Sequence, residues 1–405
     1  PPRRGGCVSE PAQEPQAIAM LDLAREVAEL RPDIDAAIAR ILESGAFIGG
    51  PEVDAFEREA AEHLGAHHAI GVNSGTDALV LALRALDVGP GHEVITTPFT
   101  FFATAEAIVQ VGATPRFADI DPVTLNLDPA TVPPLINERT RALLPVHLFG
   151  LPAPMAALRD LADAHDLVIL EDAAQAFGAR YAAPCVHCDG GCSDAQRSGL
   201  NGHAVGTLGD AAAFSFYPTK TLGAYGDAGL VTTHDPAIAA RIRQLRNHGS
   251  RPDAKYVNEV TGYNSRLDAI QAAILRVKLP HLAQQTATRR AHAETYQAVL
   301  GNLDGVTLPP LHPAHVFHQF TVQLPEDRVA PARAALDAAR IAHQHFYPLP
   351  LNDQPALAEA GSGRHDPVPV TRAVCNRVIS LPIHPYLTTD DVTRVAETVA
   401  QAVLS

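Results

Sequence analysis

The stretch from Ala69 to Asp172 alternates short apolar runs with segments of helical length, and this alternation constrains the fold more than any other feature. The apolar runs have the length of strands and lie at 69–72, 93–96, 116–120, 142–146 and 168–172. Helical patterns separate them at 78–86 and 104–111, and a helix is expected between the last two runs. Strands interleaved with helices in this way indicate a mostly parallel sheet covered on both faces. We therefore expect a large α/β domain.

Further elements are predicted on both sides of this stretch. Apolar spacing from Ile34 to Leu42 predicts an amphipathic helix, and a second helix is expected after Gly50, with Pro51 at its start. A further strand is expected at 211–216. Beyond Asp268, a helical segment at 269–299 leads out of the sheet to a strand at 316–324, a helix at 330–340, a strand at 377–381 and a closing helix at 389–403. We divide the chain into a disordered tail rich in Pro, Gly and Gln (1–17), a large domain (18–275) and a small C-terminal α+β domain (276–405).

Charge and hydropathy narrow the functional classes. The formal net charge is −14, which argues against a general nucleic-acid or anionic-membrane binder, because both of those partners attract basic surfaces. The sequence has no apolar run of about 18 residues and no secretory signal pattern at its start. We therefore expect a soluble cytoplasmic protein, in which an anionic ligand needs a local basic pocket.

Lys220 follows a strand-like apolar run at 211–216 and a turn at Pro218, and a glycine-rich stretch at 221–229 comes after it. Desolvation or nearby cations lower the pKa of a lysine amine in such a place, and the neutral amine attacks carbonyl groups. Taken alone, a surface lysine after a turn is the simpler interpretation.

Asp172 changes that balance. It ends the apolar run at 168–172, and open α/β sheets bind ligands at the carboxyl ends of their strands. A lysine for a Schiff base and an aspartate for a pyridine nitrogen are the two protein groups that pyridoxal phosphate requires. The pair therefore predicts a pyridoxal phosphate site with Lys220 and Asp172 as its catalytic residues.

Weaker signals supply the rest of a cofactor site. Gly75 and Thr76 lie where a strand passes into a helix, so their amides would face a phosphate, although an ordinary helix cap explains them equally well. Ser215 offers a hydroxyl from the lysine strand, and Gln175 is placed to lie over a cofactor ring. Their joint occurrence on one sheet edge favours the cofactor site.

Four motifs together resemble the DegT/DnrJ/EryC1/StrS family of sugar aminotransferases. They are GVNSGTDAL at 71–79, EDAAQ at 171–175, FSFYPTK at 214–220 and GYNSRLD at 262–268, in the family's order and spacing. The resemblance extends from about Ile18 to the C-terminus. It implies a fold-type I pyridoxal phosphate enzyme that works as a homodimer on a keto sugar attached to a nucleotide, usually with L-glutamate as amino donor.

The resemblance also implies a role for individual residues. Lys220 would bind the cofactor covalently and move the proton, Asp172 would pair with the ring nitrogen, and Gln175 would cover the ring. The phosphate would be held by Gly75, Thr76 and Ser215, joined by Asn264 of the neighbouring subunit. One branch of the family replaces the lysine by histidine and dehydrates sugars, and the lysine at this position argues against that branch.

Two C-terminal stretches, 347–355 and 379–387, resemble the subgroup that aminates carbon 3 of UDP- or dTDP-linked sugars. In that subgroup a histidine that touches the sugar usually precedes Tyr347, whereas this chain has Phe346, which offers no hydrogen bond. His345 beside it could compensate. Arg266 is expected to bind a sugar carboxylate or a nucleotide phosphate, with an ion pair to Asp268 as the structural alternative. We therefore expect a 3-keto sugar, with a 6-deoxy sugar as a rival to a uronate.

An insertion from Ala182 to about Leu200 departs from the family pattern. It contains Cys185, Cys188 and Cys192, a spacing that can ligate zinc together with a nearby histidine. The flanking Gly and Ser residues favour a solvated loop without metal to the same degree. Any zinc there is expected to be structural, because amination needs no metal.

Several functions remain open at this point. The leading one is amination of a 3-keto nucleotide sugar. The alternatives are a 4-keto sugar aminotransferase, a non-catalytic protein that binds pyridoxal phosphate, and a metal- or redox-sensing protein centred on the cysteine insertion. The intact set of Lys220, Asp172, Gln175 and Ser215 favours an enzyme.

Overall fold

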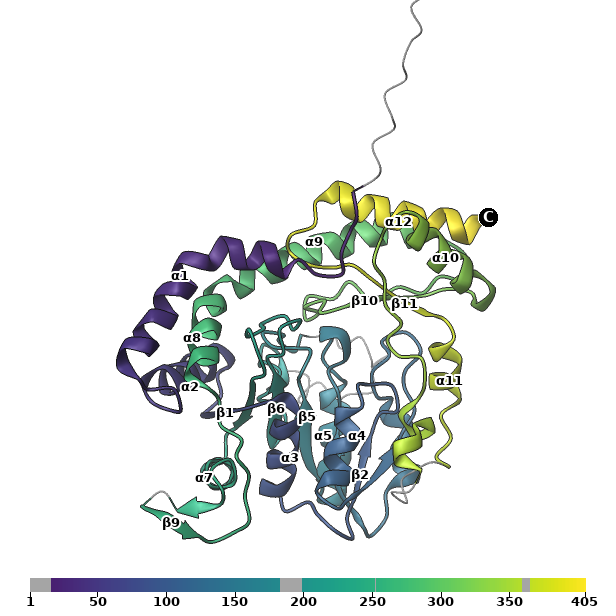
Figure 1. Ribbon diagram of the computed structural model, residues 1–405. Coiled ribbons are helices and arrows are strands. Elements are labelled where there is room, and N and C mark those ends of the chain that lie inside the picture. Colours follow the sequence, from purple (N-terminus) through teal and green to yellow (C-terminus); the bar gives the residue numbers. More distant parts are fainter. Residues whose placement is uncertain (1–15, 183–198, 252, 359–364) are drawn as a thin grey trace, which may run out of the picture.

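The computed structural model describes residues 16–182, 199–251, 253–358 and 365–405. At its centre is a seven-stranded sheet (Figure 1). The strands are β1 (His68–Val72), β2 (Glu93–Thr96), β3 (Thr114–Phe117), β4 (Thr140–Leu144), β5 (Val168–Asp172), β6 (Ala211–Ser215) and β7 (Gly229–Thr233). Their order across the sheet is β1-β7-β6-β5-β4-β2-β3, and the pairs from β6 to β3 are parallel. The prediction of a mostly parallel sheet is therefore confirmed.

Strand β7 was not predicted, and it is the one that runs antiparallel to its neighbours β1 and β6. Its first residue, Gly229, pairs with Val72 on one side and Ser215 on the other. A Cβ on Gly229 would lie 2.3 Å from the carbonyl oxygen of Ser74, so only glycine fits there. By filling the gap between β1 and β6, this strand brings the turn at Ser74 next to the lysine strand.

Helices cover both faces of the sheet, and side chains alternate between two cores. Ile169 of β5 and Phe214 of β6 pack toward one core, and their neighbours Leu170 and Ala213 pack toward the other. The first core is closed by α2 (Pro51–Leu64), α5 (Met155–His165) and α8 (Ala269–Lys278), and the second by α3 (Gly75–Ala85), α4 (Ala103–Gln110) and α7 (Pro236–Leu245). Both faces of the sheet are therefore buried, as its apolar strands require.

Two helix predictions were wrong in their extent. Helix α1 spans Leu23–Ser44 and begins well before Ile34, because the Asp22 carboxylate accepts the Arg25 amide at 2.9 Å and caps the helix there. The single helix expected at 269–299 is two helices, α8 and α9 (Leu282–Leu300), separated by a 3-10 turn at Leu279–His281. Pro280 lies in that turn and lacks the N–H that a continuous helix needs.

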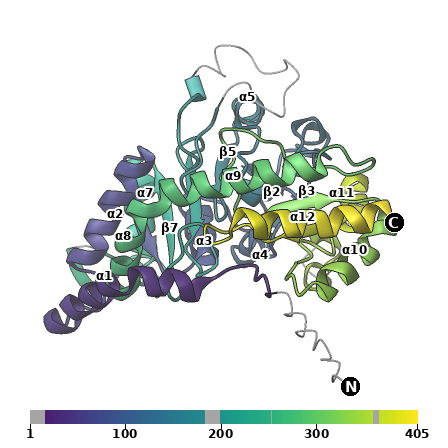
Figure 2. The ribbon, with the colours of Figure 1, turned by 90° about the horizontal axis from the view of Figure 1, so that it is seen from above.

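The C-terminal part forms a smaller unit with its own core. Helix α9 packs on α12 (Thr389–Leu404), as Figure 2 shows, and α10 (Glu326–Ala338) packs on α12 from another side. Strands β10 (Phe320–Gln323) and β11 (Val378–Leu381) pair antiparallel within it. Ile18 joins this core and bridges to Ile341, so the start of the described chain packs on the C-terminal unit. The domain boundary at 275 falls inside α8 and stays a prediction.

Three shorter elements complete the fold. Helix α11 (Pro369–Cys375) lies near the β3 edge of the sheet, where the Asp119 carboxylate accepts the amides of Val370 and Thr371. Strands β8 (Ser250–Arg251) and β9 (Ala254–Asn258) form a hairpin that was not predicted.

Some predictions lie outside the described residues. These are most of the expected disordered tail and the candidate zinc ligands Cys185, Cys188 and Cys192. Within the described ranges, no group of three or more His, Cys, Asp or Glu is arranged to hold a metal ion. The same ranges contain no helix that is both long and apolar enough to cross a membrane.

Candidate active site

A cavity of about 550 Å³ lies at the carboxyl ends of β5 and β6. The sheet domain contributes most of its wall, and the C-terminal unit contributes His318, Gln319, Phe346 and Tyr347. The cavity brings together most of the site residues that the sequence indicated: Gly75, Thr76, Asp172, Gln175, Ser215, Lys220, Phe346 and Tyr347. These residues are far apart in the chain, so their convergence is a property of the fold.

One end of the cavity is the N-terminus of α3. Ser74 caps this helix by accepting the Asp77 amide at 3.1 Å, which leaves the amides of Gly75 and Thr76 without a partner inside the helix. A Cβ on Gly75 would lie 2.5 Å from the Cβ of Ser215, so glycine allows the helix end to approach the lysine strand. The Ser215 hydroxyl oxygen accepts the Tyr217 amide at 3.3 Å, which leaves its proton free to donate. This end is suited to a phosphate.

Asp172 is buried in the cavity wall and Lys220 is half-buried beside it, and each changes the proton affinity of the other. Burial lowers the pKa of Lys220 to about 8, against the opposing effect of the negative charge on Asp172. Burial also raises the pKa of Asp172, while hydrogen bonds and the charge of Lys220 act in the opposite direction. The lysine amine is therefore partly neutral near physiological pH, as a nucleophile must be.

Two threonines that the sequence analysis did not single out orient Asp172. Thr104 donates its hydroxyl to Oδ2 of Asp172 at 2.8 Å, and its own oxygen lies 3.1 Å from the hydroxyl of Thr100. Because a carboxylate only accepts, Thr104 donates to Asp172, and Thr100 donates to Thr104. The amide of Ala174 adds a bond to Oδ1 at 3.2 Å. The carboxylate is thus fixed in the cavity wall.

Gln175 is held at both ends of its amide. Its Oε1 accepts the Phe149 amide at 2.6 Å, and its Nε2 donates to the hydroxyl of Tyr347 at 3.2 Å. The Tyr347 ring stacks near the Phe149 ring, with centroids 6.4 Å apart and planes at 14°. Gln175 therefore links the wall contributed by the sheet domain to the wall contributed by the C-terminal unit.

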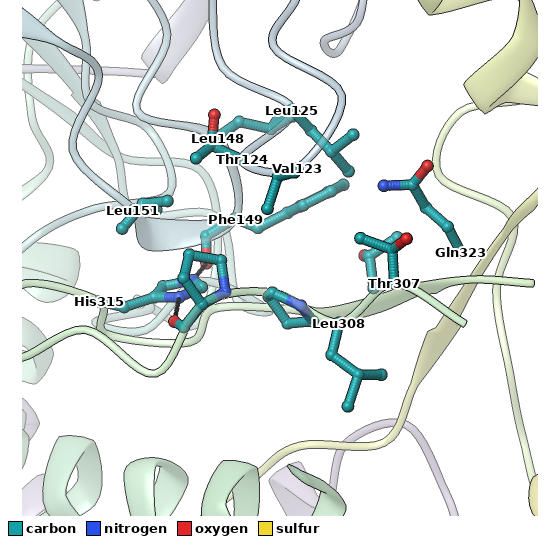
Figure 3. Close-up of a pocket in the computed structure, with 13 residues that line it drawn as sticks. Val123, Thr124, Leu125, Leu148, Phe149, Leu151, Thr307, Leu308, His315 and Gln323 are labelled. Atoms are coloured by element: carbon teal, nitrogen blue, oxygen red, sulfur yellow. Dashed lines mark hydrogen bonds between the residues drawn. The ribbon is translucent and has the colours of Figure 1, made fainter. Parts of the chain in front are cut away.

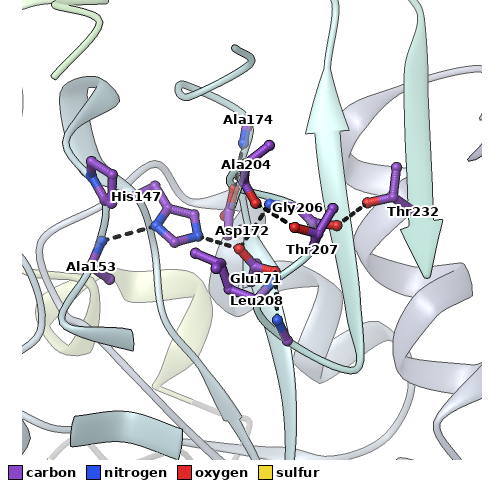
Figure 4. A network of polar contacts seen from close by, with 12 residues as sticks. His147, Ala153, Glu171, Asp172, Ala174, Ala204, Gly206, Thr207, Leu208 and Thr232 are labelled. Atoms are coloured by element: carbon purple, nitrogen blue, oxygen red, sulfur yellow. Dashed lines mark hydrogen bonds and ion pairs between the residues drawn. The ribbon is translucent and has the colours of Figure 1, made fainter. Parts of the chain in front are cut away.

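Glu171, the residue that precedes Asp172 in β5, organises a buried network (Figure 4). The carboxylate of Glu171 accepts the amides of Gly206, Leu208 and Gly209 at 2.7–2.9 Å. His147 completes the network, with Nε2 at 2.9 Å from Oε2 of Glu171. Since Nδ1 of His147 accepts the Ala153 amide at 2.9 Å, the ring proton is on Nε2 and is donated to the glutamate. The network fixes the end of β5 against the turn that leads into β6.

Three expected site residues do not line this cavity. His345 lies 2.7 Å through Nε2 from the carbonyl oxygen of Cys375. Arg266 donates to Oδ1 of Asn247 at 3.1 Å rather than to Asp268. Asn264 is exposed and forms a backbone bridge to Asn247. The roles predicted for these three residues are not tested by one chain.

A much smaller hollow lies between the two units, lined by side chains such as Leu125, Phe149 and Gln323 (Figure 3). His315 closes it, with Nε2 at 3.3 Å from the carbonyl oxygen of Phe149. Its volume is about 10 Å³, which is room for no more than about one water molecule. This hollow is packing between the units and not a substrate site.

The residues of the large cavity fit pyridoxal phosphate. The free amides at the start of α3 suit its phosphate, the buried Asp172 carboxylate suits a protonated ring nitrogen, and the Lys220 amine suits its aldehyde. The close approach of Gly75 to Ser215 brings the phosphate donors of two elements together.

The comparisons with known proteins agree with this geometry. The model of the DegT/DnrJ/EryC1/StrS aminotransferase family matches residues 28–400. The dTDP-3-amino-3,4,6-trideoxy-alpha-D-glucose transaminase of Streptomyces venezuelae is 44% identical, over 97% of this chain and 98% of its own. The UDP-N-acetyl-3-dehydro-alpha-D-glucosamine 3-aminotransferase of Acidithiobacillus ferrooxidans is 44% identical, over 94% and 96%.

A solved structure extends the similarity to the fold. The crystal structure of S. venezuelae DesV in complex with a ketimine intermediate superposes with a TM-score of 0.87 at 44% identity, covering 96% of this chain and 99% of that one. Fold and relatives together define the class, which is a pyridoxal phosphate-dependent aminotransferase. Within that class, the chain belongs to the DegT/DnrJ/EryC1/StrS aminotransferase family.

Proposed function

We propose that this protein transfers the amino group of L-glutamate to carbon 3 of a keto nucleotide sugar, for amino-sugar and polysaccharide biosynthesis. The observation that carries the proposal is the pair of Lys220 and Asp172, which line one cavity together with the free amides at the start of α3. Relatives named for 3-amino products on both dTDP and UDP sugars support the choice of carbon 3.

The polar residues Asp172, Lys220 and Gln175 of the cavity each have a task in this reaction. Pyridoxal phosphate supplies the electron sink when it is bound. The Asp172 carboxylate, oriented by Thr104, keeps a ring nitrogen protonated. The Lys220 amine takes a proton from the donor's α-carbon and returns one to the sugar carbon, for which a pKa of about 8 is well matched. Gln175, anchored by Phe149 and Tyr347, covers the ring and excludes water.

Phe346 lines the cavity where the related sugar aminotransferases usually carry a histidine. The neighbouring His345 forms a hydrogen bond with the backbone carbonyl of Cys375 instead. An apolar wall favours a methyl group over a hydroxymethyl group by only about 1–3 kcal/mol, whereas a site that pairs a carboxylate rejects ligands that lack one far more strongly. We therefore favour a 6-deoxy sugar over a uronate.

We also propose a homodimer with shared sites, in which Asn264 reaches the phosphate of the partner. Asn264 is exposed in the single chain and so is available to a second subunit. Exposed aromatic side chains support a surface that a second subunit covers. Phe101 and Tyr217, both in the cavity wall, are 61% and 52% exposed, and Tyr256 of β9 is 88% exposed. Arg266, close to Asn264 in the chain, remains a candidate for binding an anionic substrate group. A cytoplasmic location and a zinc ion at the cysteine insertion stay predictions.

The test is a substrate panel. The purified protein, loaded with pyridoxal phosphate, is given glutamate and UDP- or dTDP-linked sugars with a ketone at carbon 3 or carbon 4, and amino products are detected by mass spectrometry. We expect amination of the 3-keto sugars, and clear preference for a 4-keto sugar would overturn the assignment to carbon 3. Cofactor binding without amination of any sugar would favour a non-catalytic protein.

A single variant distinguishes the catalytic role of Lys220 from binding of the cofactor. Lys220→Ala removes the amine and leaves Asp172 and the phosphate-binding end of the cavity unchanged. We expect turnover to be lost while cofactor binding remains measurable. Turnover near the wild-type rate in this variant would contradict the role of the lysine.

A further inference from the structure

The C-terminal unit contributes one imidazole that the proposed chemistry has not used. His318 lies just before β10, lines the large cavity together with Lys220, and is 6% exposed. Its backbone amide donates to the carbonyl of Phe149 at 2.8 Å, which fixes its position against the sheet domain. Its ring Nδ1 has no hydrogen-bond partner. Buried polar atoms nearly always have one, so an unpaired nitrogen in a cavity wall is suited to binding a ligand.

The surroundings of His318 are electropositive. Burial and the charges of Lys220 and Arg289 hold the pKa of His318 well below its ordinary value, so the ring is neutral near pH 7. Arg289 of α9 is itself 4% exposed, and its Nε has no partner. Lys220 and Arg289 also line a second hollow of about 20 Å³ beside the large cavity.

The negative charge of Asp172 acts on Lys220, whereas Arg289 forms no ion pair among the described residues. The carboxylate whose charge raises the pKa of Arg289 is Glu26, and Glu26 itself pairs with Lys278 at 2.5 Å. The Arg289 guanidinium itself donates to the carbonyl of Ile383, a neutral acceptor. A negatively charged ligand group is therefore favoured on the side of the cavity where His318 lies.

We propose that His318 binds the α-carboxylate of the amino donor, on the side of the cavity where the positive charge of the buried Arg289 acts on it. This inference rests on the proposed aminotransferase function. The α-carboxylate is bonded to the carbon from which Lys220 takes a proton, so it must lie beside the lysine. A neutral His318 with its proton on Nδ1 donates a hydrogen bond to the carboxylate. The positive charge of Arg289 attracts the same carboxylate at longer range, without a hydrogen bond.

The proposal predicts different effects of His318 on the amino donor and on the keto sugar. A ketone at carbon 3 of a sugar has carbon neighbours that bear hydroxyl or amide groups and no carboxylate. Loss of His318 therefore weakens the donor half of the reaction and leaves the affinity for the keto sugar nearly unchanged.

The experiment compares His318→Leu, which removes the hydrogen bond, with His318→Asn, whose amide lies near the position of Nδ1. Two quantities are measured: the glutamate concentration that half-saturates the donor half-reaction, followed by cofactor absorbance, and the Kd of glutarate by calorimetry. Glutarate carries carboxylates but neither amine nor ketone, so it cannot react. We expect His318→Leu to weaken both by about 10–100-fold, as for loss of one hydrogen bond to a charged group. His318→Asn should restore much of the affinity.

Unchanged affinity for glutamate and glutarate in a folded His318→Leu variant would overturn the inference, as would an equal loss of affinity for the keto sugar. If the leucine variant does not fold, His318→Gln is compared with His318→Asn. The glutamine amide reaches toward Nε2 instead of Nδ1, so equal glutarate affinity in these two variants would also overturn the inference. Failure of the aminotransferase function itself appears differently, as wild-type protein whose cofactor absorbance does not respond to any amino donor.

Discussion

At the scale of single residues, the local motifs located the catalytic pair but not the groups that tune it. Lys220 and Asp172 were predictable because Asp172 ends β5 and Lys220 follows the turn after the neighbouring β6, and strand ends converge at one edge of an α/β sheet. Thr104 and His318 were not, since a lone threonine in a helix and a lone histidine in another unit carry no local pattern. Their importance follows from contacts across the chain, 68 residues apart in sequence in the case of Thr104 and Asp172.

The lowered pKa of Lys220 predicts how cofactor uptake depends on pH. Uptake requires the neutral amine, so its rate should rise through a midpoint near pH 8 and level off above, whereas a lysine with the ordinary pKa of 10.5 would keep rising. The charge on Asp172 raises the pKa of Lys220, so Asp172→Asn should move the midpoint to lower pH. Stopped-flow absorbance of the cofactor-free protein measures both. A rate that still rises beyond pH 10 would contradict the burial of the amine.

At the scale of elements, the strands with continuous apolar runs were predictable, whereas strand β7 and the break between α8 and α9 were missed. Strand β7 starts at Gly229, whose place is set by the approach of Ser74 from a different strand, so local propensity gave no sign of it. The break between α8 and α9 did have a local signal in Pro280, which the apolar periodicity on both sides obscured. The sequence analysis assigned Glu171 no role of its own, because its hydrogen-bond partners lie in other segments of the chain.

That network predicts a stability effect for Glu171→Gln. The glutamine side chain keeps the shape but turns an N–H₂ group toward amides and an imidazole that donate, so at least one buried donor loses its acceptor. We expect a loss of about 1–3 kcal/mol in the free energy of unfolding by urea. Glu138→Gln, on the exposed surface, is the matched control and should change stability by less than about 0.5 kcal/mol. Equal effects of the two substitutions would show that the network adds nothing.

At the scale of the whole molecule, the site is built from both units and, in our proposal, from two subunits. The sheet domain supplies Lys220 and Asp172, and the C-terminal unit closes the cavity with Tyr347 and His318. The sequence predicted two units but could not show how one closes over the other, because that depends on packing between distant side chains. Asn264, exposed in one chain, is the residue through which a partner would complete the site.

Complementation between two inactive variants tests the shared site. Lys220→Ala and Asn264→Ala are mixed under conditions in which subunit exchange is verified by mass spectrometry. If the residues act across the dimer, each mixed dimer contains one site with both residues intact, and amination should recover to roughly a quarter of the wild-type rate. If they act within one subunit, no intact site forms and the mixture stays inactive.

The central claim is that Lys220 carries the cofactor in the cavity it shares with Asp172. Its most direct test is to load the protein with pyridoxal phosphate, reduce it with borohydride, digest it and locate the modified lysine by mass spectrometry. The account predicts one stable pyridoxyl phosphate adduct, on the peptide that contains Lys220, and its loss when glutamate is added before reduction. An adduct on another lysine, or no retained adduct on a protein that binds the cofactor, would contradict it.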